Sequence, residues 1–456
     1  MALDRAEYDG HDDPQGRSAG VLHALIAETS IRPQAPPATD GAVSFSAPPS
    51  TGTQQTEDTM DVDDHRAIAN RLDLFHQQEE APGMVFWHPR GYAIYRVIED
   101  YIRRRMRRAG FREIRTPQLL ARSLWEASGH WEKFRDNMFA FADGERALAL
   151  KPMSCPGHLQ VFNKRTRSYR DLPLRYCEFG ACHRDETSGA LHGLMRARAF
   201  VQDDAHIFCT EQQIESEVCR FCDMLRSVYA DFGFPKFVVG FSTRPALRAG
   251  PDELWDRAEA LLAAAARAAG LHPRLQAGDG TFYGPKLEFI LGDRQGREWQ
   301  CGTIQLDFVL PERLGAEYVD ADNQRRRPAM MHQAVLGSIE RFLAVLLEHH
   351  GGNLPLWLAP EQLVIASIGE AQAAYAERVA DAFAREDFRL VLDTRPVRLP
   401  RKIFDARERG VPLLIAVGGR EERSDTVSLR YRDGQRTTLP LGEAIETLRP
   451  DAFRAV

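Results

Sequence analysis

The chain has 456 residues, of which 43% are hydrophobic and 27% are charged, and its formal net charge at pH 7 is −6. This composition is typical of a globular protein with about two or three domains, and no apolar run is long enough to span a membrane. The negative charge excludes a general attraction to nucleic acid, although the basic stretch Arg103–Arg108 is either a solvated helix face or an RNA contact. The start of the chain is acidic and has no apolar core, which argues against a secretory signal or transit peptide and predicts a cytoplasmic protein.

Residues 1–62 form a low-complexity extension rich in Pro, Ser, Thr, Gly, Ala and Gln. Such a segment cannot bury enough apolar surface to offset its chain entropy, so it is predicted to be disordered. Val21–Ala27 has the pattern of a short helix, which either docks on a partner or has no role.

A helical pattern follows over 64–80, and Ala81–His88 then predicts an extended segment. Residues 92–109 predict an amphipathic helix that Gly110 caps. Its apolar face consists of Ile94, Val97, Ile98, Tyr101, Ile102 and Met106. A strand over 111–116 is predicted to end at Pro117.

The middle of the chain alternates polar and apolar residues, as antiparallel strands with one face toward a substrate do. Strands are predicted over 174–179, 197–202, 237–241, 287–291 and 303–308. Helices are predicted over 212–232, 252–269 and 339–349.

Beyond the proline-punctuated connector Leu354–Pro360, strands and helices alternate, which predicts a compact α/β domain with a mostly parallel sheet. The predicted strands are 363–368, 389–392, 413–417 and 426–431, and the predicted helices are 372–385, 401–409 and 442–447.

Three candidate metal ligands, Cys155, His206 and His332, lie far apart in the sequence. One thiolate and two imidazoles would leave a tetrahedral Zn²⁺ with an open position, as in a substrate-binding site. Spacing alone does not decide this, because a buried cysteine and two hydrogen-bonded core histidines fit the same residues.

Four motifs surround these candidates: Gly180–Glu186 (GACHRDE), Leu191–Arg196 (LHGLMR), Phe200–Phe208 (FVQDDAHIF) and Gly337–Arg341 (GSIER). From about Asp63 to the C-terminus, the chain resembles the threonyl-tRNA synthetase family of class II aminoacyl-tRNA synthetases. The resemblance implies an α+β fold, with an antiparallel sheet flanked by helices and then a smaller α/β anticodon-binding domain. The expected domains are catalytic over 63–355 and anticodon-binding over 356–456.

The resemblance also implies a function: ATP-dependent activation of L-threonine and its transfer to tRNA(Thr). It implies one Zn²⁺ per subunit, held by Cys155, His206 and His332, together with Mg²⁺ bound to ATP. Threonine can chelate the zinc through its amino nitrogen and hydroxyl, whereas valine lacks the second ligand. The helix and strand before Pro117 match the family element that builds a homodimer.

Further roles carry over residue by residue. Arg184 and Arg341 are expected to bind the phosphates as catalytic cations. For each arginine taken alone, the alternative interpretation is a surface charge. The other expected ATP contacts are Glu186, Arg196, Phe200, Gln300 and Ser338. The expected threonine pocket consists of Met153, Asp204, Tyr283, Lys286 and Gln305, with ordinary core packing as the alternative for Met153. His130 is expected near the terminal tRNA ribose as a proton acceptor, and Glu421 and Arg430 at the anticodon.

Family members usually carry an editing domain ahead of the core, and the sequence has only the low-complexity residues there. We therefore expect serine mischarging, because binding alone discriminates a missing methyl by about 10–200-fold. Two other functions remain open: threonine activation for a non-tRNA acceptor such as a carrier protein, and a non-catalytic RNA-binding or regulatory role.

Overall fold

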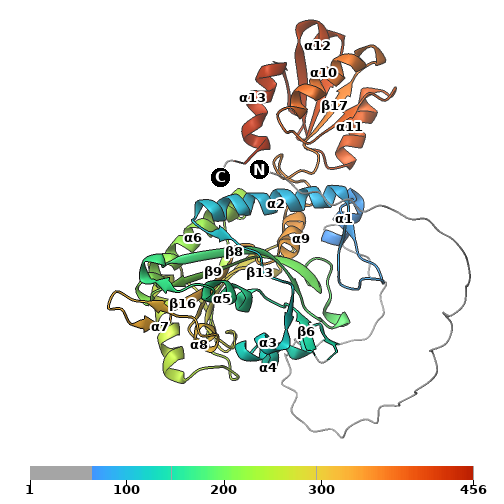
Figure 1. The fold of residues 1–456 in the computed structure, drawn as a ribbon. Helices are drawn as coiled ribbons and strands as arrows, with labels where there is room; N and C mark the ends of the chain where they lie inside the picture. The colour runs from blue at the N-terminus through green and yellow to red at the C-terminus, as the bar shows by residue number, and fades with distance from the viewer. Residues whose placement is uncertain (1–63, 145, 294, 455–456) are drawn as a thin grey trace, which may run out of the picture. The chain divides into compact units, whose positions relative to one another are not determined.

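The computed structural model describes residues 64–144, 146–293 and 295–454 (Figure 1). The predictions of disorder over 1–62 and of a short helix at Val21–Ala27 lie outside the described residues. Within the described ranges, no helix combines the length and the apolar character that crossing a membrane requires.

In this part of the chain, the main sheet has eight strands in the order β11-β10-β12-β13-β16-β9-β8-β3. Neighbouring strands are antiparallel except the outermost pair at each edge, β10 with β11 and β3 with β8. The predicted antiparallel sheet is therefore confirmed. The strands are β3 (Arg112–Glu113), β8 (Leu174–His183), β9 (Ala199–Cys209), β10 (Val238–Ser242), β11 (Arg274–Gln276), β12 (Lys286–Gly292), β13 (Glu298–Asp307) and β16 (Ala329–Ala334).

Helices cover both faces of this sheet, and small sheets lie around it (Figure 1). The helices are α1 (His65–Leu72), α2 (Pro89–Arg108), α3 (Arg122–Ser128), α4 (His130–Phe134), α5 (Cys155–Asn163), α6 (Ile214–Asp231), α7 (Asp252–Ala268), α8 (Val309–Arg313) and α9 (Ile339–His350). The short strands are β1 (Phe75–His76), β2 (Phe86–Trp87), β4 (Leu119–Ala121), β5 (Ala140–Asp143), β6 (Arg146–Leu150), β7 (Arg167–Ser168), β14 (Tyr318–Val319) and β15 (Arg325–Arg326).

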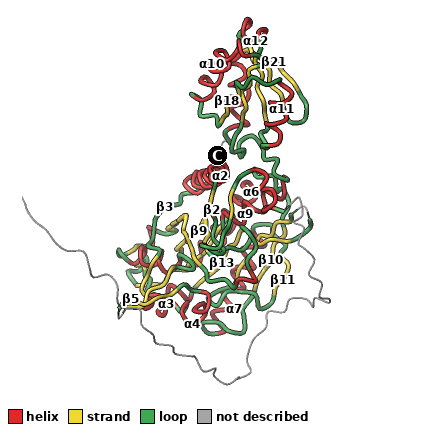
Figure 2. The backbone as a smooth tube through the Cα atoms, turned by 90° about the vertical axis from the view of Figure 1, so that its right-hand side faces the viewer, coloured by secondary structure: helices red, strands yellow, loops and turns green. Residues whose placement is uncertain are grey.

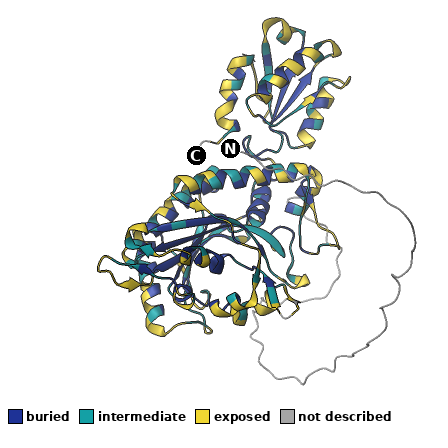
Figure 3. Ribbon diagram, in the orientation of Figure 1, coloured by how far each residue is buried: buried dark blue, intermediate teal, exposed yellow. Residues whose placement is uncertain are grey.

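The two faces of the main sheet have separate cores. Ile207 of β9 and Met331 of β16 belong to a cluster with apolar residues of α2, α6 and α9. Phe208 and Met330, one residue away on each strand, belong instead to a cluster with Phe162 of α5. Because side chains alternate between faces, even-numbered residues of β9 and β16 face α5. Figure 3 shows these central strands as largely buried.

The structure corrects the predictions for the first described elements. The helix predicted over 64–80 is α1 and ends at Leu72, where Asp73 adopts a left-handed conformation (φ 56°) that an aspartate tolerates. The chain then forms the β1–β2 pair, in which Phe75 contacts Trp87. The helix α2 begins earlier than predicted, because Pro89 suits the first turn. Only two of the six residues predicted over 111–116 form a strand, β3.

The C-terminal domain has its own sheet (Figure 2). The strand order of this sheet is β18-β17-β19-β20-β21. The helices α10 and α13 pack on one face and α11 on the other. The elements are β17 (Leu363–Ser367), α10 (Ala373–Ala384), β18 (Leu390–Asp393), α11 (Leu399–Glu408), β19 (Leu413–Val417), α12 (Gly419–Ser424), β20 (Thr426–Tyr431), β21 (Arg436–Pro440) and α13 (Leu441–Ala452).

The prediction of a mostly parallel sheet is wrong for two of the four strand pairings in this domain. The strands β18, β17 and β19 are parallel, but β20 pairs antiparallel with β19, and β21 pairs antiparallel with β20. The connection from Val417 to Thr426 is too short for a parallel crossover, which needs about a dozen residues. The sequence analysis missed β21 and α12.

Candidate functional site

The register of the main sheet brings the predicted metal ligands together. His206 of β9 lies directly opposite His332 of β16, and both side chains face α5. Cys155 is the first residue of α5. All three side chains are buried, and their ligand atoms lie within 4.8 Å of one another.

A chain of hydrogen bonds fixes the protonation of His206. His158 Nε2 lies 3.1 Å from Glu178 Oε2, and because a carboxylate accepts, that nitrogen carries the proton. His158 Nδ1 is then an acceptor, and His206 Nδ1 donates to it at 2.9 Å. The free lone pair of His206 is therefore on Nε2.

A second carboxylate fixes His332 in the same way. His332 Nε2 donates to Asp307 Oδ2 at 2.9 Å, so the lone pair of His332 is on Nδ1. That Nδ1 lies 3.0 Å from His206 Nε2, so two lone pairs point at each other in a buried site. A cation bound between them would relieve this repulsion. Two nitrogens bound to one tetrahedral zinc ion would lie about 3.3 Å apart, close to the distance found.

The charges around the cluster also favour a cation. Burial and the nearby carboxylates of Asp204 and Asp307 raise the pKa of the Cys155 thiol well above its ordinary value. Burial likewise raises the pKa of Asp204. Burial and the other two imidazoles lower the pKa of His206 well below its ordinary value, which keeps the ring neutral as a ligand must be. One sulfur and two imidazoles beside buried carboxylates thus fit a divalent metal ion.

A pocket of about 300 Å³ lies beside the cluster. The ring of Tyr283, which lines this pocket, stacks on His332 at 4.8 Å, and its hydroxyl donates to Gln305 at 2.8 Å. Many of the predicted site residues line the same pocket: Met153, Arg184, Glu186, Arg196, Phe200, Tyr283, Lys286, Gln300, Gln305, Ser338 and Arg341.

Four cations line the pocket: Arg184, Arg196, Lys286 and Arg341. Arg184 lies over the ring of Phe200, 5.1 Å from its centroid. Arg341 donates to the carbonyl oxygens of Met195 at 2.9 Å and Gln300 at 3.2 Å. Burial and the neighbouring cations Arg184 and Arg196 lower the pKa of Arg341, so a bound anion would be stabilised there. A polyphosphate beside an aromatic ring is the ligand that these groups suit.

Five of the predicted residues of the main-sheet domain do not line the pocket: Cys155, His206, His332, Asp204 and His130. Asp204 is buried beside the metal cluster, with its Oδ1 3.9 Å from His206 Nε2. His130 is fully buried, with Nδ1 2.8 Å from Ser128 Oγ and Nε2 3.6 Å from Cys155 Sγ. Tyr283, which stacks on His332, and Met153, two residues before Cys155 in the sequence, both line the pocket.

The predicted anticodon residues belong to the C-terminal domain. Glu421 lies in the first turn of α12 and accepts the Gly418 backbone N–H at 3.0 Å. Arg430 of β20 lines a small pocket with Arg432 and Arg436. Burial and Arg436 lower the pKa of Arg430, whereas Glu421 acts in the opposite direction.

Sequence analysis missed the groups that orient the ligands. Glu178 accepts from Lys151 Nζ at 2.8 Å and from Thr116, in addition to its contact with His158. Asp307 is fully buried and accepts the backbone N–H groups of Val309 and Leu310. The sequence did offer one signal for these groups, because each is a charged residue within a largely apolar strand segment. A carboxylate buried in such a strand needs hydrogen-bond partners, which marks it as a candidate for orienting other side chains.

Comparisons with known proteins identify families that match both domains. Residues 138–350 match the tRNA synthetase class II core domain (G, H, P, S and T), and residues 362–450 match an anticodon binding domain. The chain is 54% identical over 389 residues to the threonine–tRNA ligase of Paraburkholderia xenovorans (strain LB400), with 85% of this chain covered. It spans 61% of the length of that relative.

Solved structures give the same picture. The crystal structure of the RNA binding domain of threonyl-tRNA synthetase from Cryptosporidium parvum Iowa II has a TM-score of 0.84 and 40% identity, covering 86% of this chain and 99% of that chain. Giardia lamblia prolyl-tRNA synthetase in complex with prolyl-adenylate has a TM-score of 0.67 at 20% identity, covering 85% of this chain and 80% of that chain. The second likeness supports the fold alone.

Proposed function

Because the chain belongs to the threonyl-tRNA synthetase family of class II aminoacyl-tRNA synthetases, we propose that it activates L-threonine with ATP and transfers it to tRNA(Thr). The observation that carries the proposal is the convergence of one thiol and two imidazole lone pairs beside a pocket lined with cations. We assign catalysis to residues 63–355 and anticodon binding to residues 356–456.

In this proposal Cys155, His206 and His332 hold one zinc ion per subunit. Zinc held by these residues would take the amino nitrogen and the hydroxyl of threonine as two further ligands, and valine has no hydroxyl to offer. Asp204, buried beside the cluster, accepts hydrogen bonds from the substrate amino group. Tyr283 and Gln305 are already hydrogen-bonded to each other and wall the pocket beside the substrate, with Met153 filling the remaining space.

The activation step needs positive charge at the phosphates. The threonine carboxylate attacks the α-phosphorus of ATP, a new phosphorus–oxygen bond forms, and pyrophosphate leaves. We assign the α-phosphate to Arg184 and the γ-phosphate to Arg341, with Mg²⁺ accompanying ATP. Lys286 and Arg196 add charge to the same pocket. Phe200 and Arg341 enclose the adenine, while Glu186, Gln300 and Ser338 complete the nucleotide contacts.

The transfer step needs a proton acceptor. The terminal ribose hydroxyl of the tRNA attacks the carbonyl carbon of the adenylate, and AMP leaves. His130 stays the predicted acceptor of the hydroxyl proton. Its ring is fully buried, so this role requires that the bound tRNA end opens a path to it.

The remaining assignments concern partners. We propose that Glu421 and Arg430 contact the anticodon, because their charges lie in the domain that matches an anticodon binding model. A homodimer is proposed through α2 and β3, since β3 is one of the two edge strands of the main sheet and leaves backbone groups for a partner strand. A cytoplasmic location is proposed. A carrier protein as acceptor receives no support from the comparisons.

The test is threonine-dependent pyrophosphate exchange and aminoacylation of total tRNA by the zinc-loaded chain. We expect exchange with threonine, little with valine, and charging of tRNA(Thr) only. Threonine exchange without tRNA charging would show that the acceptor is wrong. If the chain catalyses pyrophosphate exchange with none of the amino acids tested, the proposal is overturned.

A further inference from the structure

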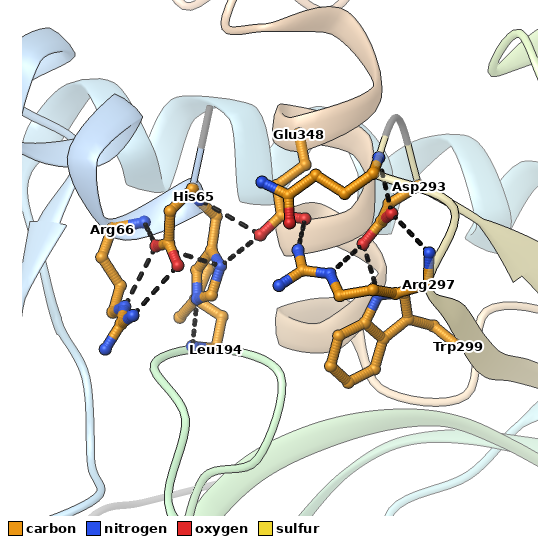
Figure 4. A network of polar contacts seen from close by, with 9 residues as sticks. His65, Arg66, Leu194, Asp293, Arg297, Trp299 and Glu348 are labelled. Carbon is orange, nitrogen blue, oxygen red and sulfur yellow. Dashed lines mark hydrogen bonds and ion pairs between the residues drawn. The ribbon is translucent and has the colours of Figure 1, made fainter. Parts of the chain in front are cut away.

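A polar network outside the catalytic residues joins α1, α9 and the loop over 192–196 (Figure 4). His65, the first residue of α1, is fully buried. Its backbone N–H donates to Glu348 Oε1 at 3.2 Å, and its Nδ1 lies 2.8 Å from the same oxygen. On the other side of the ring, Nε2 accepts the backbone N–H of Leu194 at 3.1 Å. In Figure 4 the ring lies between Leu194 and Glu348.

The partners of His65 leave one arrangement of protons. Glu348 is a carboxylate, so Nδ1 carries the proton and donates, which leaves Nε2 as the acceptor that Leu194 needs. Arg297 holds the second oxygen of Glu348 and is itself paired with Asp293. The ring is therefore fixed at both nitrogens.

The same residues meet the spacing of a metal site, because ligand atoms of Asp64, His65 and Glu348 lie within 4.8 Å of one another. Their partners argue against a bound ion. Hydrogen bonds from Arg66 lower the pKa of Asp64 to about 2, although burial acts in the opposite direction. An ion would have to displace Arg66, Arg297 and the Nδ1 proton together, so the network is complete without one.

The loop that His65 contacts is part of the proposed nucleotide site. Leu194, Met195 and Arg196 all line the cation-rich pocket. The Met195 carbonyl oxygen, next to the bonded Leu194 N–H, accepts from Arg341 Nε at 2.9 Å. Arg341 lies near the start of α9, and Glu348 lies near its end. The loop is therefore held by α9 twice, directly through Arg341 and indirectly through Glu348 and His65.

Gly193 supports a specific fit between this loop and the ring. Its φ is +50°, and a Cβ atom at this position would lie 2.2 Å from His65 Nε2. A residue with a side chain would therefore push the imidazole and the loop apart. The close approach of the ring to the backbone depends on glycine here.

We propose that His65 is a positioning residue for the nucleotide: its imidazole fixes the 192–196 loop, and with it the carbonyl that orients Arg341. This inference rests on the proposed function only in taking ATP as the ligand of the pocket. Loss of the Nε2 acceptor leaves a buried N–H unpaired, a cost equivalent to about 5- to 150-fold in an equilibrium constant. We expect this cost to appear in ATP affinity, because the displaced loop carries the carbonyl that orients Arg341. Among the described residues, no hydrogen bond joins His65 or the 192–196 loop to the residues proposed to bind zinc and threonine, so threonine binding is expected to be unaffected.

Two substitutions separate the two ring nitrogens. In His65→Asn the amide can replace the Nδ1–H donor to Glu348, but no atom replaces Nε2. In His65→Gln the carbonyl oxygen can reach toward the Nε2 position and accept from Leu194. Asn70→Ala, at an exposed position of the same helix, is the matched control. Gly193→Ala displaces the same contact from the loop side, and replaces His65→Asn if that variant does not fold.

The experiment measures ATP affinity of the zinc-loaded full chain by calorimetry, with KM for ATP and for threonine from pyrophosphate exchange. We expect His65→Asn and Gly193→Ala to weaken ATP binding about 5- to 150-fold, with KM for threonine and zinc content unchanged. His65→Gln should restore most of the affinity, and Asn70→Ala should match the wild type.

Unchanged ATP affinity in His65→Asn and Gly193→Ala would overturn the inference, as would an equal rise in both KM values, which indicates a general loss of structure. Calorimetry needs neither threonine nor tRNA. A wild-type chain that binds ATP but does not exchange pyrophosphate with threonine therefore contradicts the proposed function alone. A wild-type chain that does not bind ATP contradicts both.

Discussion

Replacing Asp307 by asparagine should weaken zinc binding without unfolding the protein. Asp307 Oδ1 accepts backbone N–H groups of Val309 and Leu310, while Oδ2 accepts from His332. In Asp307→Asn the two backbone N–H groups still need an acceptor, so the side-chain carbonyl oxygen stays in the Oδ1 position. The NH₂ group then takes the Oδ2 position and donates to His332 Nε2, which must act as an acceptor. The ring proton then moves to Nδ1, the atom that should carry the lone pair for the metal.

The magnitude follows from the same geometry. His332 Nδ1–H would donate to His206 Nε2, now 3.0 Å away, so a metal ion must displace a proton that makes a good hydrogen bond. Changing a group that orients a metal ligand typically costs 10–100-fold in metal affinity, or about 1.4–2.8 kcal/mol. The metal-free variant should keep its Tm, because the lone-pair repulsion has become a hydrogen bond.

The assay is zinc affinity by competition with a chelator, with Tm of the metal-free protein by calorimetry. Glu217→Gln is the matched control, since Glu217 is a buried carboxylate of α6 paired with Arg175. The control should lower Tm and leave zinc affinity unchanged. An Asp307→Asn protein that binds zinc within threefold of the wild type, or one that loses zinc only because it unfolds, would refute the tautomer argument.

Three further predictions concern separate parts of the molecule. Arg341→Ala should keep its zinc and lose about 10²–10³-fold in pyrophosphate exchange, because one cation at the phosphates is gone; loss of zinc from this variant would contradict the assignment. Arg430→Ala should cost about 1–3 kcal/mol in kcat/KM for tRNA and leave exchange unchanged, and an effect on exchange would speak against an anticodon role. Burial alone would raise the pKa of Glu178, but hydrogen bonds from His158, Lys151 and Thr116 lower it from 4.5 to about 2. This stabilisation is complete above pH 4.5 and is lost as the pH falls toward about 2. Urea titrations over this pH range should therefore show that the free energy of unfolding falls less steeply with decreasing pH in Glu178→Gln than in the wild type. Equal slopes of unfolding free energy against pH would count against the network.

Long periodic segments were predictable from sequence because their packing follows a local rule. The helix predicted over 252–269 is α7 (Asp252–Ala268), and that predicted over 339–349 is α9 (Ile339–His350). The helix predicted over 64–80 failed beyond Leu72, since good helix formers did not outweigh the left-handed turn at Asp73 and the pairing of β1 with β2. Likewise, the antiparallel return of β20 depends on a short connection whose length the pattern did not reveal.

The candidate site divides in the same way. Arg184, Phe200 and Arg341 lie in motifs that resemble those of the synthetase family, so the resemblance implied their grouping, and they do line one pocket. Asp307 and Glu178 could not be placed, because their contacts with His332 and His158 depend on strand register and on the approach of α5. The positioning contact between His65 and Leu194 spans 129 residues of sequence and leaves no periodic signal.

The most direct measurement of the central claim is X-ray absorption at the zinc edge on the purified full chain. One zinc ion per chain, with one sulfur at about 2.3 Å and nitrogen ligands at about 2.0–2.1 Å, is the predicted shell. In Cys155→Ala the sulfur should vanish together with the bound zinc. A stoichiometric zinc whose shell contains no sulfur, or a chain that activates threonine and rejects valine without any metal, would contradict the account.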